Sequence, residues 1–148
     1  MTQLFTTLLV LAVSFSKAEY FKVIEGKDVS TINTMLTKIS ATKETSEQRA
    51  YKGALIMKKS GFEKTPKEKL ELFKQGKTLL EKEISSNAKN TEYRFLRLII
   101  QENAPAILKY QSNIVEDAKW IKANYSSLAT DVKNSIVSYA KTSKNLDL

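Results

Sequence analysis

Three polar side chains that could recognise an anion lie together in one apolar stretch, residues 91–103 (TEYRFLRLIIQEN). Arg94, Arg97 and Gln101 stand at positions i, i+3 and i+7, so a helix places them on one face. The chain has only three arginines among its 24 basic residues, and two of them are here. Because the planar guanidinium group matches carboxylates and phosphates, this stripe predicts a site for an anion or a peptide carboxylate. The alternative is that the arginines pair with acidic residues of the same helix or of a neighbouring one.

Aromatic and acidic residues add few further candidates. Tyr110 and Trp120 could stack on a sugar or a peptide, and we add Tyr110 to the predicted binding residues, whereas a tryptophan on an amphipathic helix is more often part of the core. Glu116 and Asp117 are adjacent, so they point to different sides of a helix. No pair of carboxylates has a spacing that argues for glycosidase chemistry.

The composition excludes several classes of site. The chain contains no cysteine and no histidine, so it has no disulfide, no thiolate zinc site and no Cys–His or Ser–His pair. It also has no glycine-rich phosphate loop. We therefore predict no metal, no cofactor and no catalysis. An enzyme that uses a carboxylate or a lysine is a third hypothesis, which a buried and unpaired acid in a pocket would favour.

The positive charge of the chain offers a second binding hypothesis. The formal net charge is +8, and residues 52–82 hold nine lysines against four glutamates. This segment could contact anionic lipid or polysaccharide of a cell envelope, and such binding would weaken steeply with salt. The plainer interpretation is a solvated lysine surface. Nothing in the sequence indicates binding to nucleic acid.

The N-terminus has the pattern of a secretory signal peptide. Residues 4–15 are apolar and uncharged, and Ser16-Lys17-Ala18 places small residues at the two positions that a signal peptidase reads. We expect cleavage after Ala18 and export of the mature chain to the periplasm or the medium, with no integral membrane segment left. The alternative is an ordinary buried helix. Residues 19–27 are predicted to be an extended lead-in.

Helix signals dominate the remainder of the chain. Residues 28–143 are predicted to form a single all-α domain of about five to six helices arranged as antiparallel hairpins, followed by a frayed end at 144–148. Thr65, Pro66 and Glu68 give the clearest helix start. Gly53 lies inside a predicted helix, which costs about 1 kcal/mol relative to alanine, so we expect close approach of a neighbouring helix there.

The segment from Phe73 to Ile100 resembles the junction of two tetratricopeptide repeats. Gly76 and Leu80 match the small and large positions of a second helix, but Ala88 stands where that family generally has proline. Two segments are similar to first helices of the family, residues 49–54 and residues 94–99. They lie 45 residues apart instead of 34, so the repeat would be stretched or degenerate. The resemblance implies hairpins stacked into a shallow right-handed array whose concave face, lined by first helices, binds peptides or proteins. With only two or three hairpins, the array would be closer to a compact bundle. The signal peptide together with EYRFLRLIIQENAP also resembles small secreted proteins of Bacteroidota-type bacteria, which implies the envelope compartment.

These observations favour an exported, non-catalytic α-helical module that binds a protein or peptide partner. Its predicted contact residues are Arg94, Arg97, Gln101 and Tyr110. The alternative is a cationic envelope-binding protein that uses the lysine-rich hairpin.

Overall fold

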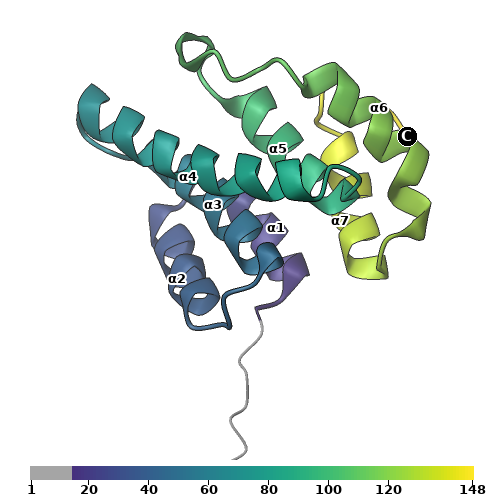
Figure 1. Ribbon diagram of the computed structural model, residues 1–148, viewed down its shortest axis with the longest axis horizontal. Helices are drawn as coiled ribbons and strands as arrows, with labels where there is room; N and C mark the ends of the chain where they lie inside the picture. Colours follow the sequence, from purple (N-terminus) through teal and green to yellow (C-terminus); the bar gives the residue numbers. More distant parts are fainter. Residues whose placement is uncertain (1–14) are drawn as a thin grey trace, which may run out of the picture.

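The computed structural model describes residues 15–148, whose regular structure consists of seven α-helices and two short 3₁₀ helices (Figure 1). The prediction of an all-helical protein is confirmed, although the number of helices is higher than predicted. Within this described part of the chain, no helix is both long enough and apolar enough to cross a membrane. The apolar run of the predicted signal peptide falls almost entirely on residues 1–14, which lie outside the described residues.

Helix α1 (Lys17–Glu25) lies where an extended lead-in was predicted, and that prediction is wrong. The Ser16 hydroxyl caps the helix by accepting a hydrogen bond from the Glu19 backbone N–H at 3.2 Å. The helix buries Tyr20, Phe21 and Ile24. Their spacing of i, i+1 and i+4 places all three on one helix face, and burial of that face supplies the stability that a nine-residue helix lacks on its own.

The expected cleavage point after Ala18 lies inside α1. Two residues before it contact the folded domain: the ring of Phe15 lies 5.2 Å from that of Tyr51, and Lys17 pairs with Glu92 at 2.9 Å. A chain that begins at Glu19 would therefore lack these contacts together with the Ser16 cap.

Helices α2 (Val29–Ser40), α3 (Ser46–Ser60) and α4 (Pro66–Ser86) follow, and α4 begins where Thr65, Pro66 and Glu68 predicted a helix start. Thr65 and Glu68 form the predicted capping box at the start of α4. At the start of α3, the Thr45 hydroxyl accepts a hydrogen bond from the Gln48 backbone N–H at 3.1 Å, whereas the Gln48 side chain donates to the Ile39 carbonyl.

Helices α3 and α4 form an antiparallel hairpin whose backbones nearly touch. A Cβ atom added at Gly53 would lie 2.7 Å from the carbonyl oxygen of Gly76 and 2.8 Å from the backbone nitrogen of Leu80. A Cβ atom at Gly76 would lie 2.5 Å from the Gly53 carbonyl oxygen. Glycine is thus required at both positions, and the predicted close approach at Gly53 is confirmed.

An ion pair at one end of this hairpin makes its stability depend on pH. Arg49 Nε lies 2.5 Å from the carboxylate of Glu83, whose side chain is buried. Its hydrogen bond with Arg49 holds the pKa of Glu83 below its ordinary value, in spite of the burial, which acts in the opposite direction. Because the folded-state pKa is depressed, this contribution is present above the ordinary pKa of a glutamate and is lost as the pH falls through the folded value.

We expect Glu83→Gln to lower the free energy of unfolding at pH 7 and to have a smaller effect at pH 3. Urea unfolding of both proteins between these pH values measures the difference. A deficit that stays constant over this range would contradict the role given to the Glu83 charge.

Helix α5 (Thr91–Asn103) is the central helix of the bundle (Figure 1). Every residue from Tyr93 to Gln101 is buried, and the helix contacts α3, α4 and α6. It ends before Pro105, which disfavours helix at the preceding residue. The chain continues through η1 (Ala106–Leu108), α6 (Ile114–Asn124), η2 (Tyr125–Ser127) and α7 (Thr130–Ala140), and α7 packs against α1.

The C-terminal residues are anchored to α5, so the prediction of a frayed end is wrong. The Glu102 carboxylate accepts hydrogen bonds from the hydroxyls of Tyr139 and Ser143 and from the Asn145 backbone N–H. Leu146 is 2% exposed and joins the core. A single carboxylate with several donors therefore holds the end of the chain in place.

Candidate functional site

The predicted stripe of α5 surrounds a buried carboxylate of α6. Asp117 is completely buried, and its carboxylate accepts hydrogen bonds from both arginines. Arg97 donates from Nε to Oδ2 at 2.6 Å and from Nη2 to Oδ1 at 2.9 Å. Arg94 donates from Nη1 to Oδ1 at 2.9 Å. Arg97 thus binds the carboxylate in the bidentate geometry typical of arginine. The carboxylate that it binds belongs to the same chain.

Further partners occupy the outer sides of the two guanidinium groups. Arg97 also pairs with Glu81 of α4 at 3.1 Å, and Arg94 pairs with Glu116 at 3.1 Å. The guanidinium of Arg94 lies 4.8 Å from the centre of the Trp120 ring, a cation–π arrangement. Burial lowers the pKa of Arg97, but the hydrogen bonds and charge of Asp117 outweigh it and leave the pKa above its ordinary value.

Gln101 and Tyr110 complete the same network. Gln101 exchanges two hydrogen bonds with Asn113, one to its side chain at 3.1 Å and one from its backbone N–H at 3.2 Å. The Tyr110 hydroxyl donates to Glu81, and its buried ring meets that of Phe73 edge to face at 5.6 Å. Burial, followed by the bond and charge of Glu81, raises the pKa of Tyr110 well above its ordinary value.

The alternative of internal pairing therefore describes the stripe in this structure. Its side chains connect α5 with α4, with α6 and with the connector that precedes α6. Among residues 15–148, no buried side-chain nitrogen or oxygen lacks a hydrogen-bond partner. A binding role for Arg94, Arg97, Gln101 and Tyr110 stays a prediction, and a ligand there would have to displace these contacts.

A large apolar groove lies on another part of the surface. Its volume is about 840 Å³, within the range of ligand pockets. It lies between the hairpin end where α3 passes into α4, the C-terminal end of α5 with η1, and the C-terminal ends of α1 and α7. In Figure 1 the α3–α4 turn and the loop that follows α5 lie at the upper left of the molecule.

The groove has a buried apolar floor and an exposed apolar rim. The floor includes Phe73 of α4 and Ile99 and Ile100 of α5. At the rim, Phe62 and Leu70 are 39% and 41% exposed, and Ile107 is 86% exposed. Large apolar side chains that gather around a concave surface make this groove a candidate binding site.

The connector after α5 holds Ile107 in this exposed position. Pro105 begins the turn, and Lys109 closes it with a positive φ of 49°, which reverses the chain direction after η1. Sequence reasoning did not identify this groove. The available signal was the presence of large apolar residues beside turn residues, Phe62 after Gly61 and Ile107 after Pro105.

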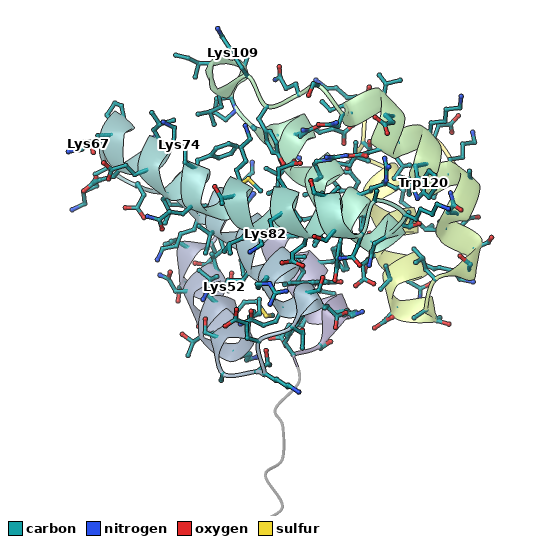
Figure 2. The ribbon with its side chains drawn as sticks, in the orientation of Figure 1. Lys52, Lys67, Lys74, Lys82, Lys109 and Trp120 are labelled. Atoms are coloured by element: carbon teal, nitrogen blue, oxygen red, sulfur yellow. The ribbon has the colours of Figure 1, made fainter. Side chains whose placement is uncertain are left out.

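Lysines of the predicted cationic surface lie on the outside of the hairpin (Figure 2). Lys67 and Lys74 project from the protruding half of α4, and Lys67 has 84% of its side chain exposed. This lysine surface borders the groove, because Lys69 of the same helix is one of the groove residues.

Comparison of the chain with family profiles, with curated proteins and with solved structures finds no match. The groove and the paired arginine network are therefore the features from which a function can be argued.

Proposed function

We propose that this protein is a non-catalytic binding module that holds a segment of a partner protein or peptide in the groove between α3–α4, α5–η1 and the ends of α1 and α7. One observation carries the proposal: the groove of about 840 Å³ whose rim exposes Phe62, Leu70 and Ile107. Exposed apolar area of this kind is costly in water, and burying it against a partner yields roughly 25 cal/mol per Å².

The stripe on α5 has a supporting role in this proposal. Ile99 and Ile100 of the groove floor lie on the helix that Arg94 and Arg97 tie to Asp117. The network thus keeps the floor in position while the rim contacts the partner. A site whose walls are already ordered loses less entropy when a ligand binds.

We also propose that the protein is exported and that its helical hairpins stack in a degenerate tetratricopeptide-like manner. Export is supported by the apolar run at residues 4–15 followed by Ser16-Lys17-Ala18. The repeat-like stacking is supported by the α3–α4 hairpin, in which Gly53 and Gly76 bring the two helices into close contact. A mass measurement of the protein isolated from the cell envelope and from the medium tests both the compartment and the N-terminus.

We expect Ile107→Asp to abolish binding of the partner, because a charge at the rim would have to be buried against an apolar surface. Val115→Asp is the matched control, since Val115 is 76% exposed and does not line the groove. Each substitution should change the free energy of unfolding by no more than about 0.5 kcal/mol, as is usual at exposed positions.

The measurement is quantitative isolation of partners from the cell envelope with the tagged wild-type protein and the two variants. A partner that is lost with Ile107→Asp and kept with Val115→Asp supports the proposal. Equal retention by all three proteins would contradict it. If retention instead falls steeply with salt and is equal for both variants, the anionic envelope surface, which is the alternative function, explains the binding.

A further inference from the structure

The groove contains an excess of positive charge that the described part of the chain does not neutralise. Lys58 near the end of α3 and Lys69 near the start of α4 line it, together with one acid, Glu25, the last residue of α1. Within residues 15–148, neither lysine has a carboxylate oxygen within 4.0 Å. A groove that is apolar in its floor thus carries two unpaired ammonium groups in its walls.

The surroundings of Lys58 show that its charge is not fully compensated. Burial lowers the pKa of Lys58, the charge of Lys27 lowers it further, and Glu25 raises it only in part. A carboxylate of a ligand would therefore interact more strongly with Lys58 than with a fully hydrated lysine, because a partly desolvated charge attracts its counter-charge more strongly.

The architecture of the groove favours a helical ligand over an extended one. An extended peptide can bind by pairing its backbone N–H and C=O groups with a sheet edge, and residues 15–148 contain no strand that could offer one. A helix satisfies these groups internally and presents apolar side chains at i, i+3, i+4 and i+7 to an apolar groove.

We infer that the groove binds an amphipathic helical segment of a partner protein, with apolar side chains against Phe73, Ile99 and Ile100 and an aspartate or glutamate paired with Lys58 and Lys69. This inference rests on the proposed function and adds the chemistry of the partner. A second copy of the chain is disfavoured as the occupant, because two chains of net charge +8 would bring their lysines together.

The test is selection of binders from a display library of amphipathic helical peptides. Their apolar positions vary among large apolar residues, and their polar positions vary freely. Four proteins are used as bait, each purified with the N-terminus it carries in its own cell: the wild type, the double variant Lys58→Gln/Lys69→Gln, the control Lys67→Gln/Lys74→Gln, and Ile107→Asp. The two double variants lose the same charge, but Lys67 and Lys74 do not line the groove.

We expect peptides selected on the wild type to carry Asp or Glu next to the apolar face. The control should select the same peptides, and the Lys58→Gln/Lys69→Gln protein should select apolar faces without this acidic preference. Replacement of the selected acid by Gln should weaken binding to the wild type about tenfold and leave binding to Lys58→Gln/Lys69→Gln unchanged, as measured by fluorescence anisotropy.

The remaining outcomes separate this inference from the proposed function. Enriched apolar faces without an acidic preference would overturn the acid recognition and leave the groove as the binding site. An acidic preference that both double variants weaken equally would assign it to general surface charge and overturn the inference. No enrichment beyond that on Ile107→Asp, or self-association of the wild type that Ile107→Asp removes, would overturn both.

Discussion

Replacement of Asp117 by Asn should lower the free energy of unfolding by about 3–5 kcal/mol, the cost expected when one partner of a buried ion pair is removed. Asp117 is fully buried, and the side chains of Arg97 and Arg94 are only 6% and 10% exposed. The amide keeps an oxygen acceptor but loses the negative charge, so two guanidinium groups remain in a poorly hydrated place with less compensation. Since small domains are stable by only about 5–15 kcal/mol, the loss is a large fraction of the total.

Urea unfolding followed by tryptophan fluorescence is a suitable measurement, because Trp120 is the only tryptophan and lies over Arg94. The matched control is Glu116→Gln, which removes an acid from the same guanidinium of Arg94. Glu116 is 66% exposed, so the control should cost no more than about 1 kcal/mol. If the two substitutions have equal effects, the buried carboxylate does not organise this part of the bundle.

A methyl group added between α3 and α4 should be the second most damaging change. We expect Gly53→Ala and Gly76→Ala each to lower the free energy of unfolding by about 1–3 kcal/mol, the usual cost of overpacking. Alanine favours an isolated helix over glycine by about 1 kcal/mol, so intrinsic helix propensity alone predicts the opposite sign. The steric contact between the helices outweighs helix propensity, because each new Cβ atom would meet backbone atoms at 2.8 Å or less. Backbone atoms cannot rotate away as a side chain can.

Gly61→Ala is the control for this prediction. Its φ of −62° is accessible to any residue, and an added Cβ would meet its nearest neighbour, the Lys58 carbonyl oxygen, at an ordinary 3.5 Å. This change should leave the free energy of unfolding unaffected or raise it by about 0.4–1 kcal/mol, because alanine lowers the conformational entropy of the unfolded chain. Thermal unfolding of the three variants provides the comparison, and stabilisation by all three would show that the hairpin is looser than the structure indicates.

Local signals in the sequence predicted most of the helices. Capping residues and apolar periodicity act over one or two turns, so Thr65, Pro66 and Glu68 mark a helix start where the structure has one. Helix α1 was missed because it is short and follows the apolar run assigned to the signal peptide. The ordered C-terminus was missed because its anchor, Glu102, is more than 40 residues away from Ser143 and Asn145.

The arrangement of the candidate site needed the tertiary structure. Arg94, Arg97 and Gln101 were identified by their spacing, but their pairing with Asp117 depends on how α5 packs against α6. The groove is lined by the ends of five α-helices and by η1, drawn from Ile24 to Thr142. No local pattern reports such a convergence, whereas a proline or glycine beside a large apolar residue could have directed attention to Ile107 and Phe62.

The most direct test of the central claim is photo-crosslinking in the living cell from a benzoyl-phenylalanine placed at Ile107, with the same residue at Val115 as the reference. Both positions are strongly exposed, and only Ile107 lines the groove. The groove hypothesis predicts a discrete covalent adduct from position 107 that disappears when Leu70, another exposed residue of the groove, is replaced by Asp. It predicts no adduct from position 115. Adducts of equal yield from both positions, or none from position 107 in a correctly folded protein, would contradict the assignment of the groove as the binding site.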